Sequence, residues 1–281
     1  MEFKPVELNS KKEIEEYLKY LNNYMCDYNF LCLYMWRNYY HYQYAIYDDY
    51  LFIKVFYKGK TYYQVPIGPD VIEGVRILLN EFKNVELICV GEEDLELLDK
   101  NYIIEYTTKE KWYDYLYDRD GLALLNGKKY KQKRNHVNGF KSMYSYDIYD
   151  IHNIDRERLK QFVINISTDE NETAVYDKIA TLDVIDNIDS LGAVGRVLVV
   201  NNHIIAFSIG IIYNNTLYVS IEKADKNYHG TYEMINNIMA ISNDVKYINR
   251  EDDLGDEGLR RSKKSYNPIE IIKKYKVKIE V

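Results

Sequence analysis

The sequence predicts an α+β protein made of two successive units, each a mixed, mostly antiparallel sheet flanked by helices. Its 281 residues are 47% apolar and 29% charged, which is typical of a globular chain with a full core. Short strand-like runs joined by turn residues alternate with amphipathic segments. The same order of elements occurs twice. We therefore expect one unit over residues 1–110, a basic connecting segment over 111–143, and a second unit over 144–281.

The first unit begins with a helix that a capping-box pattern at Ser10 and Glu13 predicts. Three strands are expected between residues 41 and 68, because turn residues interrupt an aromatic, β-branched run there. Asp70 is expected to cap a helix over about 71–83. The remaining predicted elements are a strand at 85–90, a helix at 94–98 and a strand at 102–107.

The second unit repeats this order. A strand at 144–151 precedes two helices, of which the second is predicted to start at a capping box formed by Ser167 and Glu170. Asn-Asn pairs mark the turns between three closely spaced strands. The predicted later elements are strands at 195–201, 203–213 and 216–224, a helix near 230–241, a strand at 245–249, a charged helix and a last strand at 275–281.

Composition excludes several classes of protein. The net charge is −7, so any contact with nucleic acid must come from a local basic patch. The first ten residues contain no apolar run typical of a signal peptide, and no apolar run reaches the roughly 18 residues of a spanning helix. The three cysteines are not spaced as a metal-binding pair, so reduced thiols are expected. These features indicate a cytoplasmic protein without a transmembrane segment.

The basic segment 127–141 is the first candidate site, because no acidic residue interrupts its cations. Such a run is typical of a surface that binds a phosphate-rich partner, and equally of a solvated helix that balances acidic neighbours. No recognisable RNA-binding motif decides between them. The candidate residues for a polyanion or tRNA patch are Lys128, Lys129, Lys131, Lys133 and Arg134, with Lys141 further along.

The second candidate follows the strand at 216–224. A helix start near Gly230 and Thr231 offers unpaired N–H groups that can bind phosphate, and His229 precedes them. In the GNAT acyltransferase fold this position holds a pyrophosphate loop, of which the present sequence keeps one glycine. The charged residues that end the strand, Glu222, Lys223 and Asp225, would face a cleft or form a solvated loop.

The third candidate is YINREDDLGDEGLRRSKKSYNP, residues 247–268, where five acids precede four cations. A charged loop before a solvated helix would suit the helix dipole. Clustered carboxylates repel one another, so a site with a cationic ligand is the alternative. The acids lack the spacing of a calcium loop, and no metal is expected. Motifs of serine hydrolases, P-loop proteins and zinc proteases are absent from the sequence.

The strings GKKYKQKRNHVNGF, VNNHIIAFSIG, SIEKADKNYHGTYEMIN and YINREDDLGDEGLRRSKKSYNP resemble a bacterial family of uncharacterised proteins. That family is similar to the C-terminal catalytic domain of phosphatidylglycerol lysyltransferase. The resemblance implies two tandem GNAT-like domains, as in the Fem-type peptidyltransferases. It also implies transfer of an aminoacyl group from aminoacyl-tRNA to an amine or hydroxyl acceptor.

The resemblance also implies a set of ligand-facing residues. A lysine late in the chain would stabilise the oxyanion, and Lys273 and Lys274 both remain candidates for it. The implied substrate-binding residues are Glu222, Lys223, Asp225, Asn249, Arg250, Glu251, Asp252, Asp253, Arg260, Lys264, Ser265 and Tyr266.

The leading hypothesis is an aminoacyl or acyl transferase with an ester-linked donor and no required cofactor. Acids would hold the ammonium of the aminoacyl group, and basic residues would hold the tRNA phosphates. The acceptor, a small molecule or a lipid headgroup, is open. One alternative is a CoA-dependent N-acyltransferase that binds acetyl-CoA or another acyl-CoA at Gly230. Another is a catalytically silent module that binds RNA or a small charged ligand.

Overall fold

The computed structural model describes residues 1–168 and 170–280. Two seven-stranded sheets organise the chain, and each sheet belongs to its own compact unit. The first unit comprises Met1–Asp114, Asp252–Asp256 and the residues from Ile271 onward, and the second comprises Tyr115–Glu251 and Glu257–Glu270. In the described parts of the chain, no helix combines the length and the hydropathy needed to cross a bilayer.

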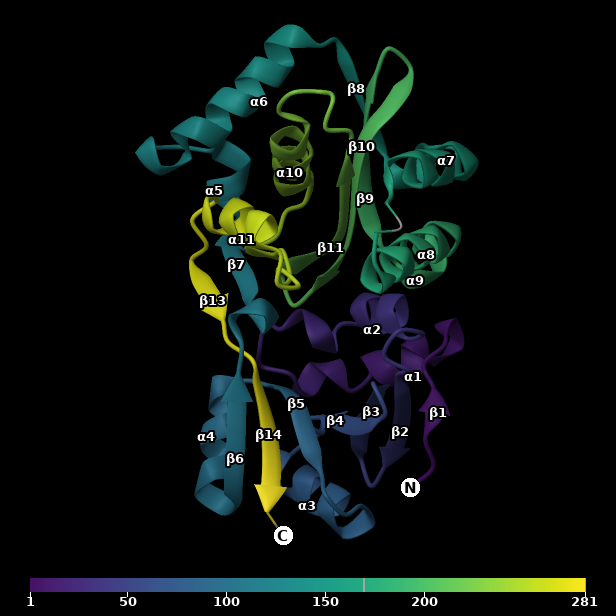
Figure 1. The fold of residues 1–281 in the computed structure, drawn as a ribbon, viewed down its shortest axis with the longest axis vertical. Helices are drawn as coiled ribbons and strands as arrows, with labels where there is room; N and C mark the ends of the chain where they lie inside the picture. The colour runs from purple at the N-terminus through teal and green to yellow at the C-terminus, as the bar shows by residue number, and fades with distance from the viewer. Residues whose placement is uncertain (169, 281) are drawn as a thin grey trace. The chain divides into compact units, whose positions relative to one another are not determined.

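The sheet of the first unit runs in the order β1-β2-β3-β4-β5-β14-β6 (Figure 1). Its strands are β1 Lys4–Pro5, β2 Gln43–Tyr47, β3 Tyr50–Tyr57, β4 Lys60–Gln64, β5 Glu86–Val90, β6 Ile103–Thr108 and β14 Tyr275–Glu280. The pair β4–β5 is parallel, whereas β14 lies antiparallel to both β5 and β6. The last strand of the sequence is therefore an interior strand of the first sheet.

Short helices complete the first unit, and side chains fix where the clearest ones begin. Asn29 caps α2 by accepting from the N–H of Cys32, and Asp70 caps α3 by accepting from the N–H of Glu73. The helices are η1 Leu8–Ser10, α1 Lys11–Glu15, η2 Leu18–Tyr20, η3 Cys26–Tyr28, α2 Phe30–Trp36, α3 Val71–Glu81, α4 Glu92–Asn101 and η4 Glu110–Trp112.

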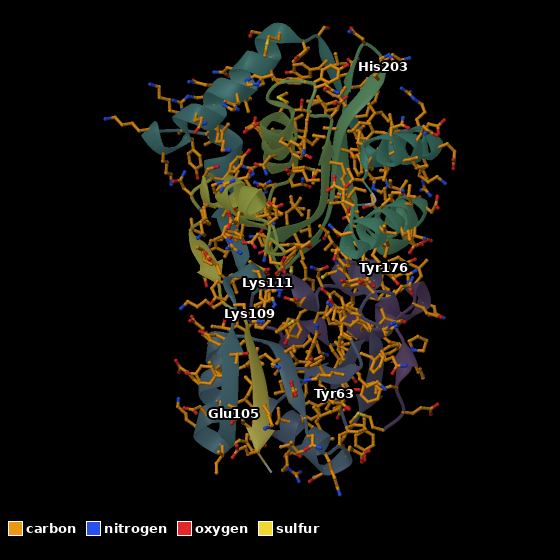
Figure 2. The ribbon with its side chains drawn as sticks, viewed as in Figure 1. Tyr63, Glu105, Lys109, Lys111, Tyr176 and His203 are labelled. Carbon is orange, nitrogen blue, oxygen red and sulfur yellow. The ribbon has the colours of Figure 1, made fainter. Side chains whose placement is uncertain are left out.

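The sheet of the second unit has the order β13-β7-β12-β11-β10-β9-β8. Its strands are β7 Asp114–Asp118, β8 Tyr146–Asp150, β9 Val194–Val200, β10 His203–Tyr213, β11 Thr216–Ala224, β12 Tyr247–Asn249 and β13 Glu270–Ile272. The strands β9, β10 and β11 form an antiparallel meander, as the turn residues predict. His203 lies at the tight β9–β10 turn (Figure 2).

Helices cover both faces of this sheet. The helices are α5 Arg119–Leu124, η5 Lys128–Tyr130, α6 Lys131–Met143, η6 Ile151–Asn153, α7 Arg156–Ile166, α8 Glu172–Asp186, α9 Ile188–Leu191, α10 Thr231–Ser242 and α11 Glu257–Lys264. Helix α10 packs on one face and is covered in turn by α5 and α6, whereas α7 and α8 lie on the other face (Figure 1). A core that includes Phe140, Leu217, Ile235 and Ile248 fills the space around α10.

The strands β11 and β12 diverge. They pair in parallel only from Thr216 to Tyr218, against Tyr247 to Asn249, although β11 continues to Ala224. A bulge at Ser220 adds one residue to β11 relative to β10. Side chains that follow this short parallel ladder, at Glu222 and Arg250, therefore lie where the two strands no longer bond to each other.

The structure differs from the predicted boundaries in three places. Segment 111–143 supplies β7, α5 and α6 to the second unit instead of forming a separate connector. The last strand returns to the first sheet, because its partners are β5 and β6. The helix expected from Ser167 begins at Glu172, where the side chain of Asn171 accepts from the N–H of Ala174.

Candidate functional site

A buried ion pair lies where β11 and β12 diverge. Arg250 Nη2 donates to Glu222 Oε1 at 2.9 Å, and the two side chains are 7% and 13% exposed. The other ends of both groups, Arg250 Nη1 and Glu222 Oε2, are buried and have no hydrogen-bond partner among the described residues. A buried polar atom without a partner loses its hydration without compensation. One unused donor and one unused acceptor thus lie on the same ion pair.

Two tyrosines and a lysine surround this pair. The Tyr266 ring lies 4.8 Å from the Arg250 guanidinium carbon, and the Tyr117 hydroxyl donates to the backbone carbonyl of Lys263. Burial opposes the charge of Arg250, but Glu222 outweighs it, so the pKa of Arg250 is raised above its ordinary value. Burial also raises the pKa of Tyr266, which keeps its hydroxyl protonated. The site therefore holds a permanent cation against a neutral ring.

Lys263 fixes the end of α11 against this site. Its ammonium donates to the backbone carbonyls of Arg250, at 2.5 Å, and Glu251, at 3.3 Å. Of the four cations on α11, it is the buried one, at 6% exposure. Sequence reasoning missed Lys263 and Tyr117. The spacing of three between Lys263 and Tyr266 was the available signal, because such residues share a helix face.

A second charged pair, Lys133 with Glu233, lies beside the Tyr266 ring. Lys133 Nζ is 3.4 Å from Glu233 Oε1 and 4.0 Å from the centroid of the Tyr266 ring. Lys133 was predicted to belong to an exposed basic patch, but it is buried with Val137 and Phe140 on the inner face of α6. Burial lowers the pKa of Lys133, and the charge of Arg250 adds to this effect while Glu233 opposes it.

The other members of the predicted basic patch have separate surroundings. Arg134 donates to the backbone carbonyls of Leu125 and Gly127, and it thereby closes the end of α5. The remaining three, Lys128, Lys129 and Lys131, are exposed. Asn267 donates to the carbonyl of Lys129 at 3.3 Å, which joins the exit of α11 to the start of α6.

The predicted phosphate loop packs against α6. Gly230 has a φ of 78°, and a Cβ there would lie 2.7 Å from the carbonyl oxygen of His136. The Thr231 hydroxyl donates to the carbonyl of Tyr228, whereas His229 is exposed. The glycine is therefore required by a close approach of two backbone segments, and it permits the turn into α10.

Other residues in the predicted set point elsewhere. Lys223 faces the opposite side of β11 from Glu222 and pairs with Asp177 of α8. Asp225 accepts from the N–H of Asn227 in the following turn. Asn249 is fully buried and accepts from the N–H of Glu251 at 2.6 Å. On α11, Lys264 is exposed, Arg260 is half-buried, and the Ser265 hydroxyl donates to the carbonyl of Ser262.

The acids at 252–256 belong to the first unit. Asp252 and Asp253 each accept from a backbone N–H two residues ahead, at 2.9 Å, so both carboxylates shape the turn. Asp253 is fully buried. The charge of Asp252 acts on Tyr40, whose pKa is raised first by burial and then by this aspartate. The sequence cluster of five acids is thus divided between two units.

Of the two late lysines, only Lys274 is buried. Its ammonium lies 2.7 Å from Asp114 Oδ1 and 3.5 Å from Cys26 Sγ, and it also pairs with Asp27. Asp27 and Asp114 outweigh the effect of burial, so the pKa of Lys274 is raised well above its ordinary value. Lys273, by contrast, is 49% exposed and pairs with Glu92 at 2.9 Å.

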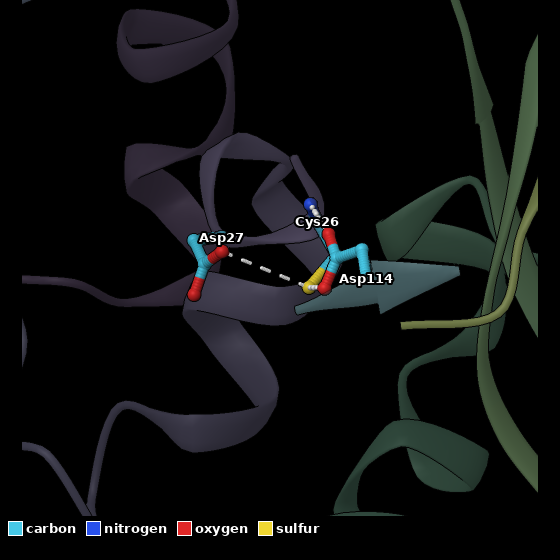
Figure 3. A group of neighbouring side chains, drawn as sticks. All are labelled: Cys26, Asp27 and Asp114. Atoms are coloured by element: carbon cyan, nitrogen blue, oxygen red, sulfur yellow. Dashed lines mark hydrogen bonds between the residues drawn. The ribbon is translucent and has the colours of Figure 1, made fainter. Parts of the chain in front are cut away.

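Cys26, Asp27 and Asp114 together resemble a metal site, because one ligand atom from each lies within 4.8 Å of the others (Figure 3). The ammonium of Lys274 already contacts all three. A metal ion would have to displace it, and a hydrogen bond with Cys32, together with burial and the nearby acids, raises the pKa of the Cys26 thiol and keeps it protonated. Lysine is therefore the cation of this cluster.

The model of the family described as "phosphatidylglycerol lysyltransferase, C-terminal" matches residues 18–278 of the chain. The chain belongs to this family. It is 32% identical to a conserved protein of unknown function from Bacteroides thetaiotaomicron VPI-5482, with a TM-score of 0.90 over 99% of each chain. This relative extends the similarity over both units.

Two more distant solved structures show the fold. The L-PGS of Bacillus licheniformis is 14% identical, with a TM-score of 0.65 over 94% of this chain and 90% of that one. A tandem GNAT protein from the clavulanic acid biosynthesis pathway is 8% identical, with a TM-score of 0.54 over 100% of this chain and 99% of that one. The prediction of two tandem GNAT-like units is confirmed.

Proposed function

We propose that the protein is an aminoacyltransferase that moves an aminoacyl group from an activated ester, such as aminoacyl-tRNA, to an amine or hydroxyl acceptor. Its family links it to lysyltransferase chemistry, and the proposal extends this link to an aminoacyl donor. The observation that carries it is the buried Arg250–Glu222 pair with its unused donor and acceptor.

An aminoacyl ester matches those two unused atoms. Its α-ammonium is a donor for Glu222 Oε2, and its ester carbonyl is an acceptor for Arg250 Nη1. When the acceptor attacks, the carbonyl oxygen becomes an oxyanion, and a permanent guanidinium stabilises it more strongly than it stabilises the starting carbonyl. The raised pKa of Arg250 keeps that charge at every physiological pH. No cofactor is needed for this step.

The tRNA part of the donor would require phosphate contacts outside the buried pair. The exposed lysines 128, 129 and 131 are the proposed contacts, because they lie on the same unit as Arg250. Phosphate contacts of this kind are independent of sequence and weaken with salt. The acyl-CoA alternative would instead place a pyrophosphate at Gly230, where the backbone of His136 is in close contact.

The test is consumption of lysyl-tRNA and alanyl-tRNA by the purified protein, with acetyl-CoA in a parallel thermal-shift arm. We expect Glu222→Gln to lose activity on the order of 100-fold, because the variant loses both the charge that holds the ammonium and the charged partner that orients Arg250 toward the oxyanion. Asp150→Asn is the matched control, because Asp150 pairs with Arg196 at another edge of the same sheet. If acetyl-CoA alone binds and neither aminoacyl-tRNA is consumed, the proposal fails.

A further inference from the structure

Four titratable side chains form a row between α6 and the start of α10. Glu233 Oε1 lies 3.4 Å from Lys133 Nζ and 3.4 Å from His136 Nδ1. The imidazole of His136 lies in turn 5.2 Å from that of His229, between ring centroids. The carboxylate of Glu233 is therefore shared by the ammonium of Lys133 and the imidazole of His136.

Solvent exposure increases along this row. The exposed fraction of the side chain is 10% for Lys133, 17% for Glu233 and 31% for His136. His229 is exposed. The row thus begins in the interior of the second unit and ends in water.

The inner end of the row meets the candidate site. Lys133 Nζ and the Arg250 guanidinium both lie against the ring of Tyr266, at 4.0 and 4.8 Å from its centroid. Burial and the charge of Arg250 lower the pKa of Lys133, so its ammonium loses a proton more readily than an ordinary lysine does. Glu222, the partner of Arg250, acts in the opposite direction.

We propose that Lys133, Glu233 and His136 form a proton path between the Arg250–Glu222 site and the surface at His229. The proposal rests on the proposed function, since it needs a reaction in which the attacking group loses a proton. Lys133 is the member of the path at the end next to the Arg250–Glu222 pair. Glu233 and His136 act through Lys133 and are positioning residues.

The proton balance shows why such a path is useful. When a neutral amine acceptor attacks the ester, a C–N bond forms, the C–O bond breaks, the nitrogen loses one proton and the leaving oxygen takes one up. An acceptor that arrives as an ammonium brings one proton more than the products hold, and that proton must leave the site. With a hydroxyl acceptor, the same base takes a proton from the attacking oxygen and returns one to the leaving oxygen. General base assistance of this kind typically contributes about 100-fold or more.

The same contacts also join α6 to α10, so the test requires readouts that packing alone does not change. The first is the titration of Lys133 followed by carbon NMR of the lysine Cε in the whole protein, independent of any transferase activity. We expect Lys133 to titrate below Lys160, whose pKa is raised by hydrogen bonds to Glu157 and Asp186, and Glu233→Gln to lower the pKa of Lys133 further because an opposing charge is lost. Identical titration of Lys133 in the wild type and in Glu233→Gln overturns the path.

The second readout is the pH dependence of aminoacyl-tRNA consumption. We expect Lys133→Met to lose about 100-fold in kcat, and His136→Gln to change the pH profile of consumption and recover activity partly with added imidazole. His203→Gln, at the distant β9–β10 turn, is the control for a histidine change. A wild type that consumes no aminoacyl-tRNA refutes the proposed function itself. An active wild type with an unchanged pH profile and no imidazole rescue in His136→Gln refutes the path alone.

Discussion

Each unit of the molecule buries a cation beside a carboxylate, Lys274 in the first and Arg250 in the second, and the surroundings of these two cations differ. In the first unit, Lys274 has three N–H groups and three acceptors, from Asp27, Asp114 and Cys26. In the second, Arg250 shares one contact with Glu222 while Nη1 and the second carboxylate oxygen stay unused. A buried charge cluster whose donors and acceptors are all paired serves stability, whereas one with unpaired buried atoms bears the cost of their lost hydration, which the proposed ligand would remove.

The largest expected effect is on stability in the first cluster. Lys274→Met would leave the buried Asp114 and the partly buried Asp27 without their cation, which costs on the order of 3–5 kcal/mol. Chemical denaturation should show this loss, and adding Asp27→Asn and Asp114→Asn to the same variant should recover part of it. A Lys274→Met protein that keeps its stability but loses transfer activity would break the comparison, since the lysine would then be part of the reaction.

A smaller effect on stability is expected in the second cluster. Glu222→Gln keeps an oxygen for Arg250 Nη2, so the loss of unfolding free energy should remain near 1–2 kcal/mol. The same variant is expected to lose most of its activity. Measuring both quantities on one preparation separates the two clusters, and equal stability losses in Lys274→Met and Glu222→Gln would contradict the distinction.

The first unit also holds a partly buried acid, Asp94. Burial, with help from Glu93, raises the pKa of Asp94 to about 6 from 3.8, whereas Asp27 and Asp114 have Lys274 beside them. A raised carboxyl pKa means that the folded state binds the proton more tightly. Its contribution to stability is thus complete below pH 3.8 and is lost as the pH rises through about 6.

The change that tests this is Asp94→Asn. We expect the unfolding free energy of the wild type to fall between pH 4 and 6 relative to that of the variant, by at most about 3 kcal/mol. Parallel pH profiles for the two proteins would show that Asp94 titrates normally.

The smallest effect belongs to the neighbour of Lys274. Lys273 pairs with Glu92 at 2.9 Å, but the side chains are 49% and 59% exposed. Solvent screens such pairs, so Lys273→Met should change stability far less than Lys274→Met does, and less still in high salt. A loss of stability that matches that of Lys274→Met would mean that position next to β14, and not burial of the charge, determines the effect.

Local sequence patterns predicted the elements that local interactions determine. The Asn-Asn turns of the β9–β10–β11 meander and the Asp70 cap of α3 are examples. The meeting of Glu222, Arg250 and Tyr266 was implied only by the family resemblance, because they come from three separated segments. The burial of Lys133 was readable, since it shares a helical stripe with Val137 and Phe140. The unbroken run of basic residues around Lys133 led instead to the prediction of a basic patch.

The partners of the last strand had no local signal. YKVKIEV alternates in a way that fits an edge of either sheet. Its place between β5 and β6 depends on pairing with residues more than 160 positions away. Nothing in the strand itself selects those partners.

This interior position of β14 has a consequence for synthesis of the protein. The strands β5 and β6 leave the ribosome long before β14, so their facing edges stay unpaired while the whole second unit is made. Unpaired strand edges are templates for aggregation. A chain that stops before residue 275 lacks β14 and should therefore keep a first sheet split in two. The first sheet can be completed only after the last strand of the sequence has been synthesised.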